Sequence, residues 1–371
     1  MKITYIYPEE AALWKNIEWR CYTPARAINH TGRHKAYLIG ARDFGKNTPQ
    51  ARVACERSDV LVIYRNLWGN TLSGIQHWRA RDKIVIADFD EAYQLLGEHD
   101  PAYPFWFEGK AASPNPAGNI TPPPVVQFKW GLQLANGATV PSKRLADDWR
   151  AFTRLEWLPG YIDLQKYMDI HPQAHDEVIL GWSGPATRLR SFEASGLLAA
   201  LQELLPQRPD VRLLLCCDQQ VDAESLGLPP QQVLEMPVRS EADWPQPLAY
   251  MDIGLHPLEG AFDQRSGWPA LLEWMALKIP WAASRGPACL ELNHYGWLVE
   301  NTAGAWLRIL QDMVDHLADY RAEAARAAYM FGISQGIEEN VSQVLETYAR
   351  LAGPLAAVES QSRPIIPTST L

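Results

Sequence analysis

The chain has 371 residues, of which 47% are hydrophobic and 21% are charged. This length exceeds one ordinary domain and this composition excludes disordered and fibrous proteins, so we expect about two globular domains. The formal net charge of −9 at pH 7 opposes binding to nucleic acid over a broad surface, although it leaves room for a local basic groove.

The amino terminus, "MKITYIYPEE", lacks the features of an export signal. Its apolar stretch is too short and it turns acidic at once. No run approaches the roughly 20 apolar residues that cross a bilayer. Five cysteines without CxxC spacing indicate reduced thiols, and Cys216 and Cys217 fit small buried hydrophobic residues better than a redox pair. The sequence therefore predicts a cytoplasmic protein without a transmembrane segment.

The first half alternates short apolar runs with segments that can hold helices, expected around residues 48–55 and 72–81. Strands are predicted at residues 2–7, 35–40, 59–64, 83–88, 138–142 and 154–159. Near-continuous apolar strands separated by helices indicate a parallel sheet covered on both faces.

Residues 98–124 interrupt this alternation because they are too rich in Pro and Gly for regular structure. Long loops of this kind in compact domains are usually functional or disordered. Their aromatic residues favour a docking loop or lid, with packing onto the sheet edge as the alternative; they are Tyr103, Phe105, Trp106 and Phe107.

The pattern then starts again. A helix is predicted at 192–205, and long helical segments at 305–331 and 334–352. Strands are predicted at residues 177–184, 210–218, 232–237, 251–258 and 279–284. We therefore predict an α/β protein with two tandem Rossmann-like, doubly wound parallel-sheet domains and a cleft between them.

The predicted organisation has five parts. Residues 1–166 form the first domain, 167–177 a hinge, and 178–335 the second domain. Residues 336–352 form a final helix, and 353–371, rich in Ser, Pro and Thr, a mobile tail. Because ligands of open α/β sheets bind at the carboxyl ends of the strands, the chemistry is expected in the loops that follow them.

One such loop is "GWSGPATRLR", residues 181–190. Gly181 and Gly184 permit close backbone approach, and the next helix offers N–H groups to an anion. Thr187, Arg188 and Arg190 would complete a phosphate site. A tight turn with solvated arginines is the alternative, since neither G-x-G-x-x-G nor a Walker sequence occurs.

Asp88 and Asp90 end an apolar strand of the first half. Two carboxylates at this spacing could hold a divalent cation between diphosphate oxygens. Alternatively, one of them caps the following helix and the other is solvated. Neither HExxH, zinc-ribbon spacing nor Gly-x-Ser-x-Gly occurs, so a zinc enzyme or serine hydrolase has little support.

Glu273 is the one anion in residues 266–284, which otherwise resemble a protein interior. A helix beginning near Pro269 places it in the first or second turn, where the helix dipole favours a carboxylate by about 0.3–1 kcal/mol. A buried carboxylate needs hydrogen-bond donors. Two ribose hydroxyls would serve, and the alternative is an internal partner such as Arg265 or Arg285.

Residues 251–284, with "DIGLHPL", "LLEWMALKIP" and "WAAS", resemble the donor-binding segment of GT-B-fold retaining glycosyltransferases, the large group related to sucrose-phosphate and trehalose-phosphate synthases. "EVILGWSGPATR" (177–188), "ATVPSKRLADDW" (138–149) and "IVIADFDEAY" (84–93) add to this resemblance. The resemblance is specific over roughly residues 178–300.

This resemblance implies a hexosyltransferase that moves a sugar from a nucleoside-diphosphate sugar to a hydroxyl, with retention and without an obligatory metal or other cofactor. Glu273 would bind the ribose, and Pro237 would lie beside the base. The donor-binding set implied is Gly181, Ser183, Gly184, Thr187, Pro237, Leu258, Glu259, Ser266 and Glu273.

Departure of the diphosphate develops negative charge, so cations should face it. Arg188 and Arg190 are the first candidates, followed by Arg265 and Lys143. The first domain would bind the acceptor, with Asp88, Asp90 and Lys143 on that side, and the final helix would cross back onto it. The acceptor is left open between a glycan, a lipid headgroup and a modified nucleobase in DNA.

The chain also departs from the family pattern. A second glutamate usual eight positions before Glu273 is Arg265, and a lysine usual three positions before it is Ala270. The Gly of the family's Ala-Leu-Gly-Ile-Pro is Lys278, and residues 7–26 replace a Gly-Gly loop. Either the donor sugar is unusual, or the chain is a catalytically inactive nucleotide- or sugar-binding scaffold on the same fold.

Overall fold

The structure is a computed structural model that describes residues 1–10, 13–110 and 119–353. It divides into two compact units. The first comprises Met1–Glu9, Arg20–Leu158 and the described residues from Val341 onward; the second comprises Glu10–Trp19 and Pro159–Asn340. The short stretch after the first strand is therefore part of the second unit.

The main segment of the second unit begins at Pro159, before the predicted hinge at 167–177, and the unit includes residues 10–19, which were predicted in the first domain. Residues 167–177 pack within the second unit, where the Gln173 N–H donates to the Ala249 carbonyl at 2.7 Å. The role of these residues as a hinge stays a prediction. The crossing of the final helix back onto the first domain also stays a prediction. The predicted mobile tail lies, apart from Gly353, outside the described residues.

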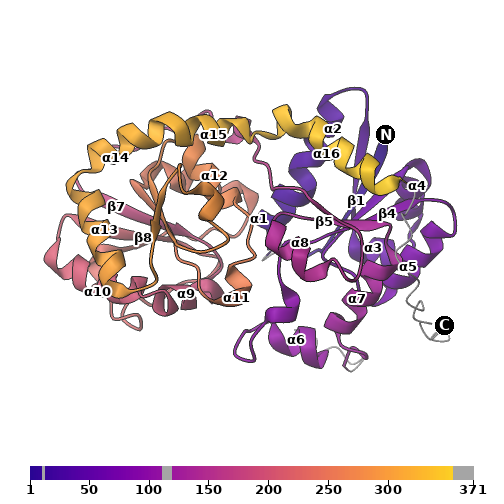
Figure 1. Cartoon of the computed structure of the whole chain (residues 1–371), viewed down its shortest axis with the longest axis horizontal. Coiled ribbons are helices and arrows are strands. Elements are labelled where there is room, and N and C mark those ends of the chain that lie inside the picture. The colour runs from indigo at the N-terminus through magenta and orange to yellow at the C-terminus, as the bar shows by residue number, and fades with distance from the viewer. Residues whose placement is uncertain (11–12, 111–118, 354–371) are drawn as a thin grey trace. The chain divides into compact units, whose positions relative to one another are not determined.

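The first unit is built on a parallel sheet, of which β1, β4 and β5 are labelled in Figure 1. Its strand order is β2-β1-β3-β4-β5-β6. The six strands predicted for this half are confirmed, and they are β1 Lys2–Tyr7, β2 Lys35–Gly40, β3 Val60–Tyr64, β4 Ile84–Asp88, β5 Gly137–Val140 and β6 Leu155–Trp157. Every residue of β3 is buried, as expected for a strand covered on both faces.

Helices connect these strands, and α4 and α8 begin at a side-chain cap. They are α2 Thr23–His30, α3 Ala41–Lys46, α4 Pro49–Arg57, α5 Asn70–Arg79, α6 Tyr103–Glu108, α7 Pro124–Leu134 and α8 Lys143–Trp149. The Thr48 hydroxyl accepts from the Ala51 N–H, and Ser142 caps α8 in the same way. Both are short polar side chains placed directly before a helix.

The prediction that residues 98–124 lack regular structure is wrong in part, because α6 forms within them. Pro104 occupies a first-turn position, where its missing N–H is not needed. Trp106 is buried and stacks on Tyr93 with ring centroids 3.9 Å apart, so this side chain packs onto its own unit. Residues 111–118 lie outside the described part of the chain.

The second unit repeats the architecture, with strand order β12-β11-β10-β7-β8-β9 and all pairs parallel. The strands are β7 Val178–Ser183, β8 Val211–Cys216, β9 Val233–Glu235, β10 Ile253–His256, β11 Trp281–Ser284 and β12 Trp297–Val299. The first five were predicted. β12 was not predicted.

The helices of the second unit are α1 Trp14–Ile17, α9 Arg190–Ala194, α10 Leu197–Gln207, α11 Gly260–Asp263, α12 Pro269–Ala276, α13 Ala303–Asp315, α14 Leu317–Glu323 and α15 Tyr329–Ser334. The final helix, α16 Ile337–Ala352, begins in this unit, and its residues from Val341 onward pack in the first.

Two predicted helices are interrupted. The one at 192–205 breaks at Gly196, whose φ of +83° belongs to the left-handed region that favours glycine. The long helix at 305–331 breaks at His316, where φ is −121° and ψ is 32°. Apolar periodicity continues across both breaks, which is why the sequence pattern did not locate them.

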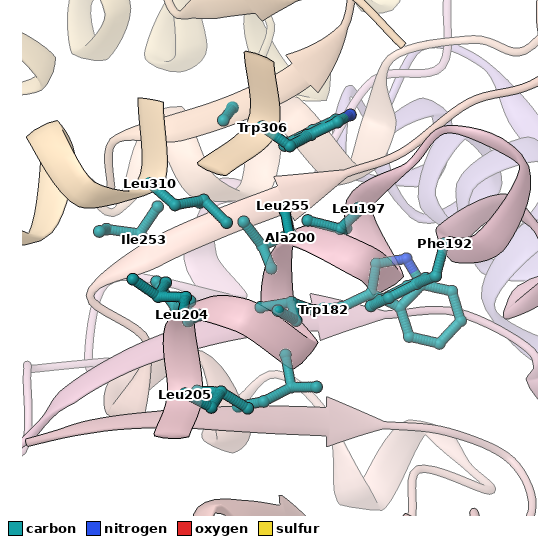
Figure 2. Packing of buried hydrophobic residues seen from close by; sticks show 14 of the residues in the cluster. Trp182, Phe192, Leu197, Ala200, Leu204, Leu205, Ile253, Leu255, Trp306 and Leu310 are labelled. Atoms are coloured by element: carbon teal, nitrogen blue, oxygen red, sulfur yellow. The ribbon is translucent and has the colours of Figure 1, made fainter. Parts of the chain in front are cut away.

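The second sheet is covered on both faces, and alternate strand residues face opposite cores. Leu213 and Leu215 pack with α10 and α13, whereas Leu214 and Cys216 pack with α12 on the other face. Figure 2 shows the first of these cores, where Trp182 and Phe192 lie together and Trp306 and Leu310 project from α13; the other labelled residues are Leu197, Ala200, Leu204, Leu205, Ile253 and Leu255.

All five cysteines are free and buried. Burial raises the pKa of Cys216 and of Cys217 to about 12, so both remain protonated at neutral pH. Among the described residues, no helix has both the length and the apolar character needed to span a membrane.

Candidate functional site

The carboxyl ends of all strands in the second sheet lie at one edge, because every pair is parallel. Ser183 ends β7, His256 ends β10 and Ser284 ends β11. The loop after β10 leads through α11 to α12, the helix that carries Glu273. Most of the predicted donor-binding residues are thereby gathered at this edge.

Glu273 lies in the second turn of α12, as predicted, and is only 1% exposed. Its Oε1 accepts hydrogen bonds from the Tyr167 hydroxyl at 2.6 Å and the Trp244 indole N–H at 3.1 Å. Its Oε2 lies 3.0 Å from the Lys15 ammonium. Both carboxylate oxygens therefore have partners inside the protein, and neither Arg265 nor Arg285 is among these three.

Lys15 comes from α1, in the stretch that follows β1 of the first unit but packs in the second. Its ammonium donates to the Ser183 hydroxyl at 3.1 Å and lies 3.4 Å from the centre of a Trp244 ring. Burial lowers the pKa of Lys15, while the negative charge of Glu273 opposes that shift. One cation thus joins Ser183 and Glu273, two residues of the predicted donor site.

The stretch around Lys15 is held to the second unit at several points. Trp14 and Trp19 pack against the same core as α12. Lys166 binds the Glu18 carboxylate at 2.8 Å and also pairs with Glu241. The position of Lys15 therefore rests on apolar burial as well as on its own ion pair.

The turn after β7 offers an anion few free backbone groups. The Gly184 N–H donates to the Cys216 carbonyl at 3.1 Å, and the Ala186 N–H donates to the Asp218 carboxylate at 2.8 Å. A 3-10 helix of three residues, Ala186–Arg188, follows this turn, and the α-helix begins only at Arg190 and is five residues long. Charge for an anionic ligand at this turn must therefore come from side chains.

Arg188 lies beside this turn and pairs with Asp263, with Nη1 and Oδ1 2.9 Å apart. Asp263 is buried, and its Oδ2 also accepts from the Ser191 hydroxyl and the Glu259 N–H. The Arg188 guanidinium stacks over the Phe262 ring at 4.2 Å. Asp263 thus connects the β7 turn to the loop after β10.

The other predicted donor-side residues differ in their surroundings. Arg190, Thr187, Pro237 and Glu259 are exposed, and the Glu259 carboxylate accepts from the Asn301 amide at 2.9 Å. Arg265 and Ser266 are half-buried, and Arg265 donates to the Ala261 carbonyl at 2.8 Å.

Two predicted donor-binding residues serve the packing of the second unit in this structure. The Leu258 N–H donates to Ser284 Oγ at 2.8 Å. Gly181 lies buried inside β7, where a Cβ atom would come within 2.3 Å of the Met251 side chain. Its missing side chain therefore makes room for Met251.

His256 ends β10 beneath Trp274, with ring centroids 6.3 Å apart. Burial lowers the pKa of His256 to about 4, while the nearby charge of Asp263 opposes that shift. The imidazole is therefore neutral at pH 7, and it adds no positive charge to this edge of the sheet.

On the predicted acceptor side, in the first unit, Asp88 and Asp90 bind different arginines. Asp88 is 1% exposed and pairs through both oxygens with Arg20, whose Nε lies 3.0 Å from Oδ2. The Thr139 hydroxyl also donates to Asp88, at 2.7 Å. The buried Asp88 carboxylate is thus occupied by donors, contrary to a solvated or capping role.

Asp90 lies 3.2 Å from the Nε of Arg65, which also pairs with Glu91. Arg65 directly follows β3, is 4% exposed and has a φ of +61°, a strained backbone conformation for a non-glycine residue. Its Nη1 has no hydrogen-bond partner among the described residues. Buried guanidinium groups are normally satisfied, so a polar ligand or water is the expected partner here.

Lys143 is exposed at the first turn of α8, with its ammonium 4.8 Å from the centre of the Trp157 ring. Residues 1–10, 13–110 and 119–353 contain no cluster of three or more His, Cys, Asp or Glu side chains that could hold a metal. Because Asp88 and Asp90 each engage an arginine, their pairing as ligands of one cation loses its support.

The residues that sequence reasoning missed are Lys15, Tyr167 and Trp244 around Glu273, and Asp263 as the partner of Arg188. Lys15 left one signal: it is a single cation within "ALWKNIEW", in the very stretch that replaces the family's Gly-Gly loop. Tyr167 and Trp244 left none, because their contact with Glu273 depends on the tertiary fold.

The chain resembles several solved structures. It aligns with an alpha-glucosyltransferase in complex with UDP at a TM-score of 0.65 and 12% identity, covering 95% of this chain and 100% of that one. A sucrose-phosphate synthase from Thermosynechococcus elongatus aligns at 0.62 and 14% identity, covering 95% and 99%. A UDP-GlcNAc 2-epimerase from Neisseria meningitidis bound to UDP-GlcNAc aligns at 0.52 and 9%, covering 94% and 100%.

No protein-family model and no curated protein matches the sequence. At these low identities the structural likeness establishes the fold, which is the GT-B fold predicted from the sequence. The fold also occurs in the epimerase, so function must be argued from the site.

Proposed function

We propose that this protein is a glycosyltransferase that moves a hexose from a nucleoside-diphosphate sugar to a hydroxyl acceptor with retention of anomeric configuration. One observation carries the proposal: Glu273, Ser183 and two cations lie at the carboxyl edge of the second sheet. The cations are Lys15, which pairs with Glu273, and Arg188, which pairs with Asp263. This edge is where open α/β sheets bind ligands.

The proposed donor is a uridine-diphosphate sugar. Two of the aligned structures contain UDP or UDP-GlcNAc, which supports uracil as the first base to test. In this proposal Glu273 accepts hydrogen bonds from the ribose hydroxyls. Because Glu273 is 1% exposed, its internal partners must rearrange when the nucleotide binds.

The chemical step breaks the bond between the anomeric carbon and the diphosphate oxygen. Positive side chains that face the departing diphosphate lower the barrier, because negative charge develops there. We assign this role to Arg188, Arg190 and Arg265. Arg188 is held by Asp263 and Phe262, so its guanidinium is preorganised beside the β7 turn. The proposal includes no side-chain general base and no obligatory metal.

The first unit is proposed to bind the acceptor, and its charge supports an anionic one. Residues 1–9, 20–158 and 341–371 hold 21 Lys and Arg against 16 Asp and Glu, a formal charge of +5. The second unit holds 13 against 27, a formal charge of −14. Such asymmetry within one chain favours a polyanionic partner for the basic part. Of the three acceptor classes, a modified nucleobase in DNA fits this best.

At the end of β3, Arg65 would donate to the acceptor from its unpartnered Nη1, and the neighbouring carboxylate of Glu91 would accept from a hydroxyl. A hydroxyl both donates and accepts, so this pair of groups suits it. Arg65 and Glu91 thereby replace Asp88, which Arg20 already engages, in the proposed acceptor site.

The test is turnover. Purified protein is incubated with UDP-glucose, UDP-GlcNAc and the corresponding GDP and ADP sugars, with hydroxymethylated DNA or oligosaccharides as acceptors. UDP release that depends on acceptor, with an α-linked product from an α-linked donor by NMR, is the expected result. Release of UDP with inverted product would contradict retention, and no turnover with any pair would contradict the activity.

A catalytically inactive nucleotide-binding scaffold is the second candidate, and the internal pairing of Glu273 favours it. It predicts nucleotide binding without transfer to any acceptor. Turnover by the wild-type protein that is lost in Arg188→Met, while nucleotide binding is retained, would exclude the inactive scaffold.

A further inference from the structure

We propose that Lys15 is a further cation that receives the diphosphate of the donor, and that it pairs with Glu273 until the donor binds. The inference rests on the proposed function and adds a residue to it. The Lys15 ammonium lies 3.0 Å from Oε2 of Glu273, the residue predicted to bind the ribose. It also lies 3.1 Å from the Ser183 hydroxyl, at the turn predicted to approach the diphosphate. No other described lysine contacts both.

The first argument is a missing cation. Where the resembled family carries a lysine three positions before the ribose-binding glutamate, this chain has Ala270. Lys15 places an ammonium beside that same glutamate from a different segment of the chain. Lys15 on α1 thus supplies, beside Glu273, the positive charge that α12 lacks.

The second argument is the chemistry of the β7 turn. The N–H groups of Gly184 and Ala186 are engaged by the protein, and Ala186 is bonded to the carboxylate of Asp218. A diphosphate at this turn therefore finds these two backbone donors engaged and meets a nearby negative charge. A cation on a flexible stem is needed, and the Lys15 ammonium already contacts the side chain that ends β7.

The third argument is the division of hydrogen bonds on Glu273. Tyr167 and Trp244 both bind Oε1, whereas Lys15 binds Oε2. If Lys15 moves to the diphosphate, Oε2 becomes free to accept a ribose hydroxyl, and Oε1 keeps its donors. A half-buried ammonium is stabilised by a counter-charge in both states, and the exchange supplies the Glu273 carboxylate first and the diphosphate afterwards.

The segment around Lys15 is fixed well enough for this exchange. Trp14 and Trp19 anchor it in the core of the second unit, and Glu18 ties it to Lys166. The ammonium lies between the rings of Trp244 and Trp19, 3.4 Å and 5.1 Å from their centres. Aromatic faces stabilise a cation without forming a directional bond, so they allow it to change partners.

The test compares affinities for UDP and uridine, which differ only in the diphosphate. Changing Lys15 alone leaves a buried carboxylate unpaired, so the comparison uses Glu273→Gln against Glu273→Gln/Lys15→Met, measured by titration calorimetry. We expect the ratio of UDP to uridine affinity to fall about tenfold or more when Lys15 is removed, and Lys15→Arg in the wild-type background to retain most of it.

Lys166→Met is the matched control, because it removes a lysine that holds the same segment through Glu18 without touching Lys15. It should leave the UDP-to-uridine ratio unchanged. An equal loss of UDP and uridine affinity on removing Lys15 would make its role structural and overturn the inference. Wild-type protein that binds no nucleoside diphosphate would instead contradict the proposed function, and the inference with it.

Discussion

The buried ion pair of Lys15 and Glu273 is the residue-scale feature on which the site depends. Removing one member of such a pair leaves an uncompensated charge in the interior. Glu273 is also bonded to Tyr167 and Trp244, so it joins α12, the chain at residue 167 and the loop at residue 244. A change at Glu273 therefore alters stability as well as any ligand contact.

We predict that Glu273→Ala lowers the free energy of unfolding by about 3–5 kcal/mol, because the Lys15 ammonium loses its counter-charge. Glu273→Gln/Lys15→Met should recover most of this loss, since neither charge then remains buried. Chemical denaturation followed by tryptophan fluorescence measures both. A Glu273→Ala protein as stable as wild type would show that the ion pair contributes nothing to folding.

His256 gives a pH-dependent prediction. Its pKa is about 4 in the folded protein, below the ordinary value near 6.5, so the unfolded chain binds the proton more readily. Stability is therefore fully present above pH 6.5 and is lost as pH falls towards 4. Between pH 7 and pH 5 this histidine should account for a loss of about 2 kcal/mol.

His256→Gln should remove that part of the pH dependence, as measured by thermal unfolding of both proteins at pH 7 and pH 5. His30→Gln, a change at an exposed histidine of the first unit, serves as the control. Equal pH dependence in wild type and His256→Gln would contradict the assignment.

At the scale of elements, the strand pattern was predictable because buried parallel strands are continuous apolar runs. Eleven runs predicted as strands coincide with β1 to β11, and β12 was not predicted. Helix ends were harder to predict, since the apolar periodicity of 192–205 continues past the break at Gly196. The position of Glu273 on α12 was predictable from Pro269, whereas its partners Lys15, Tyr167 and Trp244 come from distant segments and required the fold.

The break between α9 and α10 supplies an element-scale prediction. Gly196 has a φ of +83°, and a Cβ atom there would lie 2.6 Å from the Ala303 backbone N. Gly196→Ala therefore combines backbone strain with a clash against α13, and we expect a loss of about 2–3 kcal/mol in stability. Gly260→Ala is the matched control, with a φ of +74° and no atom within 4 Å.

Backbone strain alone should lower the free energy of unfolding of Gly260→Ala by about 1 kcal/mol. Thermal unfolding of the two variants separates the contributions. Equal losses of stability in the two variants would mean that α13 moves aside without an energetic cost. The clash with Ala303 would then not contribute to the effect of Gly196→Ala.

At the scale of the whole molecule, the formal charge of −9 conceals a basic unit and a strongly acidic one, at +5 and −14. The net charge opposes nucleic-acid binding over a broad surface, and the division of the chain into units locates the basic part on which the proposed DNA acceptor depends. Sequence reasoning could not assign residues 10–19 to the second unit, because that assignment depends on tertiary contacts.

We predict that the protein binds duplex DNA weakly and that affinity falls linearly with salt on a double-logarithmic plot, as phosphate contacts by Lys and Arg require. Arg33→Glu/Lys35→Glu, at exposed basic positions of the first unit, should weaken binding and reduce the slope. Fluorescence anisotropy between 20 and 200 mM NaCl checks this. Affinity that is absent at low salt would favour a neutral glycan as acceptor.

The central claim is that a nucleoside-diphosphate sugar binds at the carboxyl edge of the second sheet. Hydrogen exchange with mass spectrometry, with and without UDP or another nucleoside diphosphate, tests it most directly. The account predicts slower exchange in residues 183–189, around α11 and the start of α12, and in the segment that carries Lys15. Protection confined to the first unit, or no protection with UDP, GDP, ADP or CDP, would contradict it.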